Sequence, residues 1–172
     1  MQRIIFLDID GPVINTPCYW VDSRASTQRA IMNTQSIGIL NQLCKIAGAK
    51  IVTNSTHNTW PVRETGRSLK QDLVKWGIPE TNFHETWRTS YPWPKDRIGA
   101  TNRSRRMWGI QEWIDEHGEC DWICFDDEVF TDDPRLFVID FDRGIDYDVY
   151  LNVLKHWNKD KSHEHLLYRP GS

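Results

Sequence analysis

The sequence has little of what would mark a zinc-stabilised, membrane-bound or strongly cationic protein. It contains only four cysteines, and no two of them form a Cys-x-x-Cys pair, which argues against a structural zinc site. No apolar run approaches the length of a membrane span, and the apolar stretch after Arg3 is too short for a signal peptide. The net charge of −3 gives no overall positive field toward nucleic acid. We therefore expect a cytoplasmic protein with reduced thiols and no membrane partner.

Internal repeats, low-complexity tracts and linkers are also lacking, so nothing divides the 172 residues into separate domains. This length is enough for one domain with a substantial core. We expect that domain to span residues 1–157. Residues 158–172, which are rich in lysine, histidine and serine, are expected to form a loosely held tail.

What the sequence does have is an alternation of short apolar runs and helical patterns. The runs are continuous, as in parallel strands covered on both faces, and occupy residues 3–7, 49–53, 121–125 and 136–140. Apolar residues recur at helical spacing within residues 37–47, 69–76, 110–117 and 146–157. The alternation predicts an α/β fold with a largely parallel central sheet flanked by helices. Residues 84–106 show no clear period and are expected to form a long loop.

The first apolar run ends in two aspartates one residue apart, in the segment FLDIDGPV. Such a segment is often only a turn or a helix cap. However, side chains alternate along an extended backbone, so Asp8 and Asp10 point to the same side. Two carboxylates held together in this way need a positive partner. Mg²⁺ binds one or two carboxylates and leaves room for phosphate oxygens, so the spacing favours a metal, a phosphate or both.

The next two runs also end in polar residues. These are Thr53, Asn54 and Ser55 after the second run, and Asp126 and Asp127 after the third. Each group alone is more typical of a turn, a cap or a solvated corner. In an open parallel sheet, however, ligands bind beyond the carboxyl ends of the strands. Taken together, the three strand ends predict a metal and phosphate pocket.

In their order and spacing, these segments resemble the motifs of the haloacid dehalogenase (HAD) superfamily of phosphohydrolases. FLDIDGPV resembles the first motif, IVTN the second, the basic residues before the helix at residues 110–117 the third, and ICFDDE the fourth. The resemblance implies a Rossmann-like HAD fold with a minimal cap. The layout is similar to the HAD domains of nucleic-acid repair proteins and to their phage and bacterial relatives.

The resemblance also implies roles for the carboxylates. Asp8 would be the nucleophile that forms an aspartyl-phosphate, and Asp10 the general acid that protonates the leaving oxygen and later activates water. The implied cofactor is Mg²⁺. Its ligands would be Asp8, the main-chain carbonyl of Asp10, and Asp126 and Asp127, either directly or through water.

The phosphoryl group would be bound by residues from three segments. These are Thr53, Asn54 and Gly11, with Arg106 as the basic contact and Arg105 and Lys95 as alternatives to it. Arginine suits the basic position because its fork grips two oxygens. Pro12 removes one backbone donor, and we expect Val13 and the rest of the loop to supply N–H groups in its place.

Aromatic and basic residues near these motifs suit a nucleotide or a nucleic-acid end as the phosphorylated substrate. They are Trp20, Trp60, Tyr91, Trp93, Arg63, Arg67, Arg88, Arg97 and Arg103. The same aromatic residues could instead pack loops onto the sheet. Two other functions stay open, a phosphatase of another small phosphorylated metabolite and a non-catalytic binding protein on a HAD scaffold. His57 is expected to be a surface residue of a loop, with substrate contact as the alternative.

Overall fold

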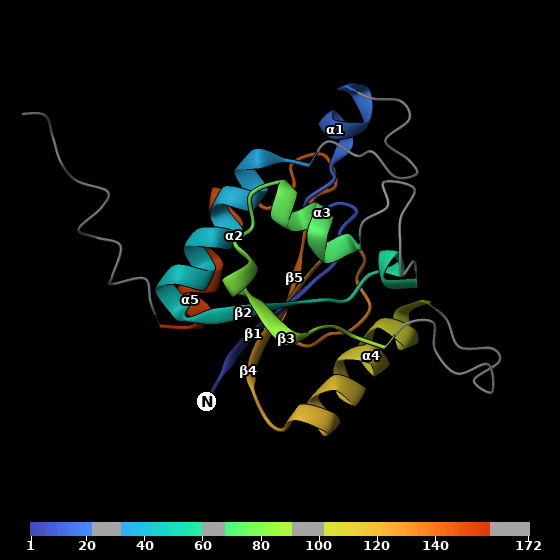
Figure 1. The fold of residues 1–172 in the computed structure, drawn as a ribbon, viewed down its shortest axis with the longest axis vertical. Helices are drawn as coiled ribbons and strands as arrows, with labels where there is room; N and C mark the ends of the chain where they lie inside the picture. Colours follow the sequence, from blue (N-terminus) through green and yellow to red (C-terminus); the bar gives the residue numbers. More distant parts are fainter. Residues whose placement is uncertain (22–31, 60–67, 91–101, 159–172) are drawn as a thin grey trace, which may run out of the picture.

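The computed structural model describes residues 1–21, 32–59, 68–90 and 102–158. Its centre is a sheet of five parallel strands in the order β3-β2-β1-β4-β5 (Figure 1). The strands are β1 Arg3–Leu7, β2 Ala49–Thr53, β3 Phe83–Arg88, β4 Asp121–Asp126 and β5 Leu136–Val138. This sheet confirms the predicted α/β fold.

Helices lie along both faces of the sheet (Figure 1). They are α1 Thr16–Val21, α2 Thr34–Ala47, α3 Leu69–Lys75, α4 Asn102–His117 and α5 Tyr147–His156, with short 3₁₀ turns η1 Thr56–Thr59 and η2 Glu80–Asn82. Two of the helices have caps that their sequence explains. Gly48 ends α2 in the left-handed conformation with φ of 66°, and Asp146 caps α5 by accepting the N–H of Val149 at 3.0 Å.

The pleat of the sheet divides the core into two layers. In β1, Ile5 and Leu7 pack with α2, α3 and α5, whereas Ile4 and Phe6 pack with α4. Successive side chains of a strand point to opposite faces, and both faces of this sheet are covered. This explains why the apolar runs are continuous. It also means that each residue at a strand end is directed to a particular face.

The structure corrects the expected loop over residues 84–106. Its beginning forms strand β3, and its last residues form the first turns of α4. β3 is an edge strand with mostly exposed or half-buried side chains, so it needs no continuous apolar run. Its pairing with β2 is irregular, with a register shift between Ile51 and Thr53. Helix α1 is not among the helices that the apolar spacing predicts. No helix of the described residues is long and apolar enough to cross a membrane.

Candidate active site

Three carboxylates meet beyond the carboxyl ends of β1 and β4, which are neighbours in the sheet. Asp8 follows β1, and its backbone N–H donates to the carbonyl of Phe125 at 2.9 Å, which continues the pairing of the two strands. Asp126 ends β4, and Asp127 follows it. One oxygen from each carboxylate lies within 4.8 Å of the others. Strand pairing thus unites acidic groups that lie far apart in the sequence.

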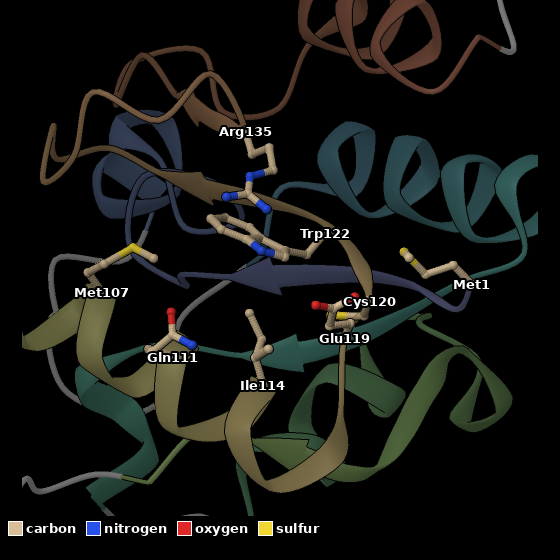
Figure 2. A pocket seen from close by; sticks show the side chains of 8 residues that line it. All are labelled: Met1, Met107, Gln111, Ile114, Glu119, Cys120, Trp122 and Arg135. Carbon is tan, nitrogen blue, oxygen red and sulfur yellow. The ribbon is translucent and has the colours of Figure 1, made fainter.

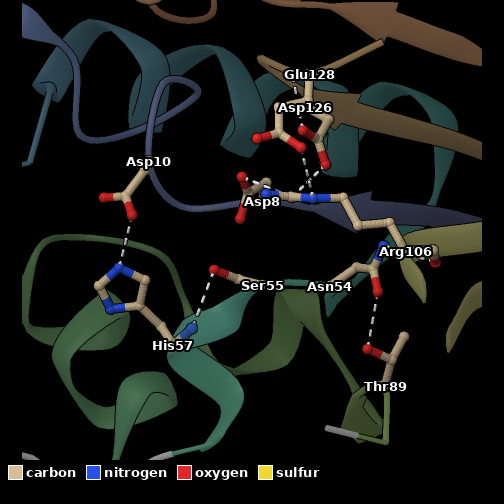
Figure 3. Close-up of polar contacts among 9 residues, drawn as sticks. All are labelled: Asp8, Asp10, Asn54, Ser55, His57, Thr89, Arg106, Asp126 and Glu128. Carbon is tan, nitrogen blue, oxygen red and sulfur yellow. Dashed lines mark hydrogen bonds and ion pairs between the residues drawn. The ribbon is translucent and has the colours of Figure 1, made fainter. Parts of the chain in front are cut away.

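Arg106 reaches this cluster from α4 (Figure 3). Its Nη1 lies 2.8 Å from Oδ2 of Asp8 and also contacts Oδ2 of Asp126. Its Nε lies 3.7 Å from an oxygen of Glu128. Asp8 stands two positions after Phe6 and therefore faces the same side of the sheet, where α4 packs. The structure thus brings the first, third and fourth predicted segments together.

Burial makes the ionised forms of these carboxyl groups costly. It raises the pKa of Asp8 despite the nearby guanidinium of Arg106. Burial, followed by the charge of Asp8, raises the pKa of Asp126 to about 8 and that of Asp127 to about 6. Burial alone would lower the pKa of Arg106, but Asp8 and Asp126 raise it above its ordinary value. The guanidinium therefore favours the ionised carboxylates, but burial outweighs it.

Gly11 lets the loop after β1 approach the loop after β4. Its φ is +83°, and a Cβ at this position would lie 2.6 Å from Cβ of Asp127, so glycine is required for both reasons. The amides of the loop bond within it. Gly11 donates to the carbonyl of Ile14 at 2.8 Å, and Val13 donates to that of Ile9 at 3.1 Å. The expectation that Val13 offers its N–H to phosphate is therefore wrong in this structure.

Thr53 ends β2, but its side chain lies on the opposite face of the sheet from Asp8. In the strand register, Thr53 pairs with Leu7, one residue before Asp8, and adjacent residues point to opposite faces. Thr53 is fully buried, and its hydroxyl donates to Oδ1 of Asn58 at 2.7 Å. The structure does not bring the predicted hydroxyl to the acidic cluster.

Ser55, in the turn after β2, places a hydroxyl beside the cluster instead. Although burial raises the pKa of Asp8, hydrogen bonding from the Ser55 side chain acts in the opposite direction and favours the carboxylate. Ser55 is itself buried, and its Oγ accepts the backbone N–H of His57 at 3.3 Å. Ser55 was among the polar residues at this strand end, but the turn that redirects it leaves no signal in the apolar pattern.

Asn54 holds α4 in place, where sequence reasoning expected a substrate contact. Its Nδ2 donates to the carbonyl of Arg106 at 3.3 Å, and its Oδ1 accepts the hydroxyl of Thr89 at 2.9 Å. Its backbone N–H donates to the carbonyl of Leu7 at 2.8 Å. Gly109 makes this packing possible, because a Cβ there would lie 3.0 Å from Oδ1 of Asn54. Asn54 therefore supports the residue that reaches the cluster. Neighbouring Arg105 is half-buried on α4.

Asp10 lies on the other side of the site, where it meets His57 (Figure 3). Nε2 of His57 lies 3.0 Å from Oδ2 of Asp10. The side chain of His57 is 9% exposed and that of Asp10 is 38% exposed. The expectation that His57 is a surface residue is therefore wrong, and sequence spacing carried no sign of its contact with the first motif.

A family model described as the HAD domain in Swiss Army Knife RNA repair proteins matches residues 4–148. The chain belongs to this family. This confirms the resemblance found in the motifs, and it assigns the chain a phosphohydrolase-type fold and function in general terms. Searches of curated proteins and of solved structures found no match.

The acidic cluster of this HAD domain has the donor set that Mg²⁺ prefers. All three groups of the cluster are carboxylates, and Asp127 is only half-buried, which leaves one side open to a phosphate or water. Oδ2 of Asp8 is buried and is contacted by Nη1 of Arg106. Three carboxyl groups thus gather around the guanidinium of Arg106, and this excess of acidic groups fits a divalent cation.

A separate hollow of about 290 Å³ lies between α4 and β4 (Figure 2). It is lined by Met1, Met107, Gln111, Ile114, Glu119, Cys120, Trp122 and Arg135. No residue of the acidic cluster lines it, and one carboxylate among mostly neutral groups offers no metal or phosphate chemistry. The chemistry of the HAD domain therefore belongs to the carboxyl ends of the strands.

Several predicted residues lie outside the described part of the chain. They are Trp60, Arg63, Arg67, Tyr91, Trp93, Lys95 and Arg97, together with the side chains of Trp20 and Arg103. Among the basic residues proposed to surround the substrate, Arg88 is described. It is exposed at the end of β3, where its Nη1 donates to the carbonyl of Asn58 at 3.4 Å.

Proposed function

We propose that this HAD domain is a Mg²⁺-dependent phosphomonoesterase that works through an aspartyl-phosphate and acts on a nucleic-acid terminal phosphate or a nucleotide. The observation that carries the proposal is the cluster of Asp8, Asp126 and Asp127 with Arg106 as its cation. Burial, and then the charge of Asp8, raises the pKa of the last two carboxyl groups, so bringing all three into the ionised form calls for more positive charge than Arg106 supplies. A cation and a phosphoryl group would complete this charge arrangement.

In the proposed reaction, a carboxylate oxygen of Asp8 attacks phosphorus, and the bond from phosphorus to the leaving oxygen breaks. Asp10 donates its proton to that leaving oxygen, which departs as an alcohol. Water then attacks phosphorus, gives its proton to Asp10 and releases inorganic phosphate and the free Asp8 carboxylate. Mg²⁺, held by Asp8, Asp126 and Asp127 with the main-chain carbonyl of Asp10, would reduce the repulsion between carboxylate and phosphoryl oxygens.

We assign the hydroxyl that binds the phosphoryl group to Ser55 and not to Thr53. Ser55 lies beside Asp8, whereas the Thr53 hydroxyl bonds to Asn58 on the other face of the sheet. Arg106 would hold a phosphoryl oxygen with the part of its fork that is not bound to carboxylates. Gly11 would keep the loops after β1 and β4 close enough to enclose the reacting group.

A nucleic-acid substrate is supported by the family and by an exposed arginine at the carboxyl edge of the sheet. The family description names RNA repair proteins. Arg88, exposed on the same edge of the sheet, lies 5.3 Å above the ring of Trp87 and offers a cation for a neighbouring phosphate of a strand.

The test is phosphate release from a panel of esters in Mg²⁺ and in EDTA. The panel holds 5′- and 3′-nucleotides, oligonucleotides phosphorylated at either end, and sugar phosphates. We expect release that requires Mg²⁺, disappears in Asp8→Asn, and is fastest with oligonucleotide ends. A preference for sugar phosphates would contradict the proposed nucleic-acid substrate. If no ester released phosphate, the proposed phosphatase activity would be contradicted and a binding function favoured.

A further inference from the structure

One turn of the chain contacts both aspartates of the first motif. The turn runs from Ser55 to Asn58 and overlaps η1. At its start, the Ser55 hydroxyl interacts with Asp8, and two residues later His57 binds Asp10. Loop aspartates that are partly exposed ordinarily sample several rotamers. A hydrogen bond to a buried ring favours the rotamer of Asp10 that makes it.

We propose that His57 is a positioning residue for Asp10, which it holds in the orientation needed to protonate the leaving oxygen. This inference rests on the proposed function, because it concerns the general acid of that reaction. An imidazole nitrogen suits the task because it donates to a carboxylate or accepts from a carboxylic acid, depending on its tautomer. The same contact therefore persists before and after the proton leaves Asp10.

The hydrogen bonds around His57 show how the turn that carries it is held. Its backbone N–H donates to Oγ of Ser55 at 3.3 Å. The next residue, Asn58, is buried and fastens the turn to the end of β2, because its Nδ2 donates to the carbonyl of Thr53 at 2.8 Å and its Oδ1 accepts the Thr53 hydroxyl. The predicted second-motif threonine thus acts as an anchor for the turn that carries His57.

Burial argues against direct recognition of substrate by His57. Its side chain is far less exposed than that of Asp10, which its Nε2 contacts (Figure 3). A residue placed behind the acid affects the protonation step more than substrate binding. We therefore expect the effect of its loss in kcat and not in KM.

The experiment compares two substrates whose leaving groups need the acid to different degrees. An alkyl ester, such as a 3′-phosphorylated oligonucleotide, needs its leaving oxygen protonated, whereas p-nitrophenyl phosphate releases a stable phenolate. Asp10 also activates water in the second step, which both esters share, so the rate compared is release of the leaving group in a single turnover. In His57→Ala we expect this rate for the oligonucleotide to fall roughly tenfold to a hundredfold, at or below the lower end of the roughly 10²- to 10⁴-fold contribution of a general acid. For p-nitrophenyl phosphate the fall should stay below about threefold, with KM for both esters nearly unchanged.

Two further variants separate positioning from folding. His57→Gln keeps a side-chain N–H at a similar distance from the backbone. It should restore most of the rate that His57→Ala loses with the oligonucleotide. His156→Ala, an exposed histidine at the end of α5, should leave both rates unchanged. Thermal unfolding of each variant checks that the fold is intact.

The outcomes distinguish this inference from the proposed function. If His57→Ala lost the same share of its rate with both esters, or if His57→Gln recovered none of it, His57 would have a structural role. The inference would then be overturned, but the proposed phosphatase function would not. A wild-type protein that hydrolyses neither ester in Mg²⁺ would overturn the proposed function and the inference together. A selective loss with the oligonucleotide, restored by glutamine, supports both.

Discussion

Nη1 of Arg106 lies 2.8 Å from Oδ2 of Asp8, and this ion pair joins helix α4 to the end of the central strand β1. This contact makes the stability of the fold depend on the charge of the site. The Arg106 side chain is only 12% exposed, so removing its charge leaves buried carboxylates without their cation.

We therefore expect Arg106→Met to lower the free energy of unfolding by about 3 kcal/mol in EDTA, the lower end of the cost of breaking a buried ion pair. The cost stays at that end because Asp126 takes up a proton readily. Urea unfolding measures it. Mg²⁺ should stabilise this variant more than the wild type, since the cation replaces the missing charge. Arg106→Lys is the matched control and should retain part of the stability; equal stability of all three proteins would contradict the coupling.

The raised pKa values predict an unusual dependence of stability on pH. Burial and the charge of Asp8 raise the pKa of Asp126 from 3.8 to about 8 and that of Asp127 to about 6. At a pH between the ordinary aspartate pKa of 3.8 and these raised pKa values, the folded protein holds protons that the unfolded chain has released. The unfolded state then binds fewer protons, so stability without metal should fall as the pH rises from about 4 to about 8.

Mg²⁺ should reverse this trend, because it binds the ionised carboxylates and displaces their protons. The gain in Tm from Mg²⁺ should thus be larger near pH 8 than near pH 5, measured by thermal unfolding in Mg²⁺ and in EDTA. Calorimetry in two buffers should detect the released protons. Asp126→Asn removes the group with the higher pKa and should flatten the curve. A metal-free Tm that rises steadily over this range would contradict the prediction.

The strands that carry the site were predictable because they are buried on both faces. Continuous apolar runs matched β1 and β2 to the residue, since every position of a covered strand contacts the core. The edge strand β3 was not predicted because only Phe83 of FHETWR is buried, so the segment has no continuous apolar run. Its position depends on pairing with β2, which the sequence pattern does not display.

The candidate site, like the fold, was predictable only in the part that depends on local sequence pattern. Strand ends identified Asp8 and Asp126, and helical spacing identified Arg106, because these depend on local pattern and on one general property of parallel sheets. The direction of Thr53 depends instead on register, which places it opposite Leu7 and turns it away from Asp8. Contacts made in turns, such as that of His57 with Asp10, depend on the folded path of the chain and leave no periodic signal.

The different positions of Thr53 and Ser55 predict different effects of removing each hydroxyl. Thr53→Val should lower stability by about 1–3 kcal/mol, because Oδ1 of Asn58 loses its buried donor. Ser55→Ala should change stability less but reduce kcat roughly tenfold to a hundredfold, because it removes a hydroxyl aimed at the phosphoryl group. Urea unfolding and phosphate release measure the two quantities. A Thr53→Val protein that is stable but inactive would mean that Thr53, and not Ser55, binds the phosphoryl group.

Gly11 offers a test of the close approach between the two acidic loops. A Cβ at this position would lie 2.6 Å from that of Asp127, and φ of +83° is strained for any other residue, so Gly11→Ala should destabilise the fold by about 1–3 kcal/mol. Mg²⁺ affinity should fall as well, because Asp127 must shift. The matched control is Gly38→Ala in α2, where nothing lies within 4 Å of the added Cβ. That variant should gain about 0.5–1 kcal/mol through helix propensity. If both substitutions changed stability and Mg²⁺ affinity alike, contact between the loops would not be what holds the carboxylates together.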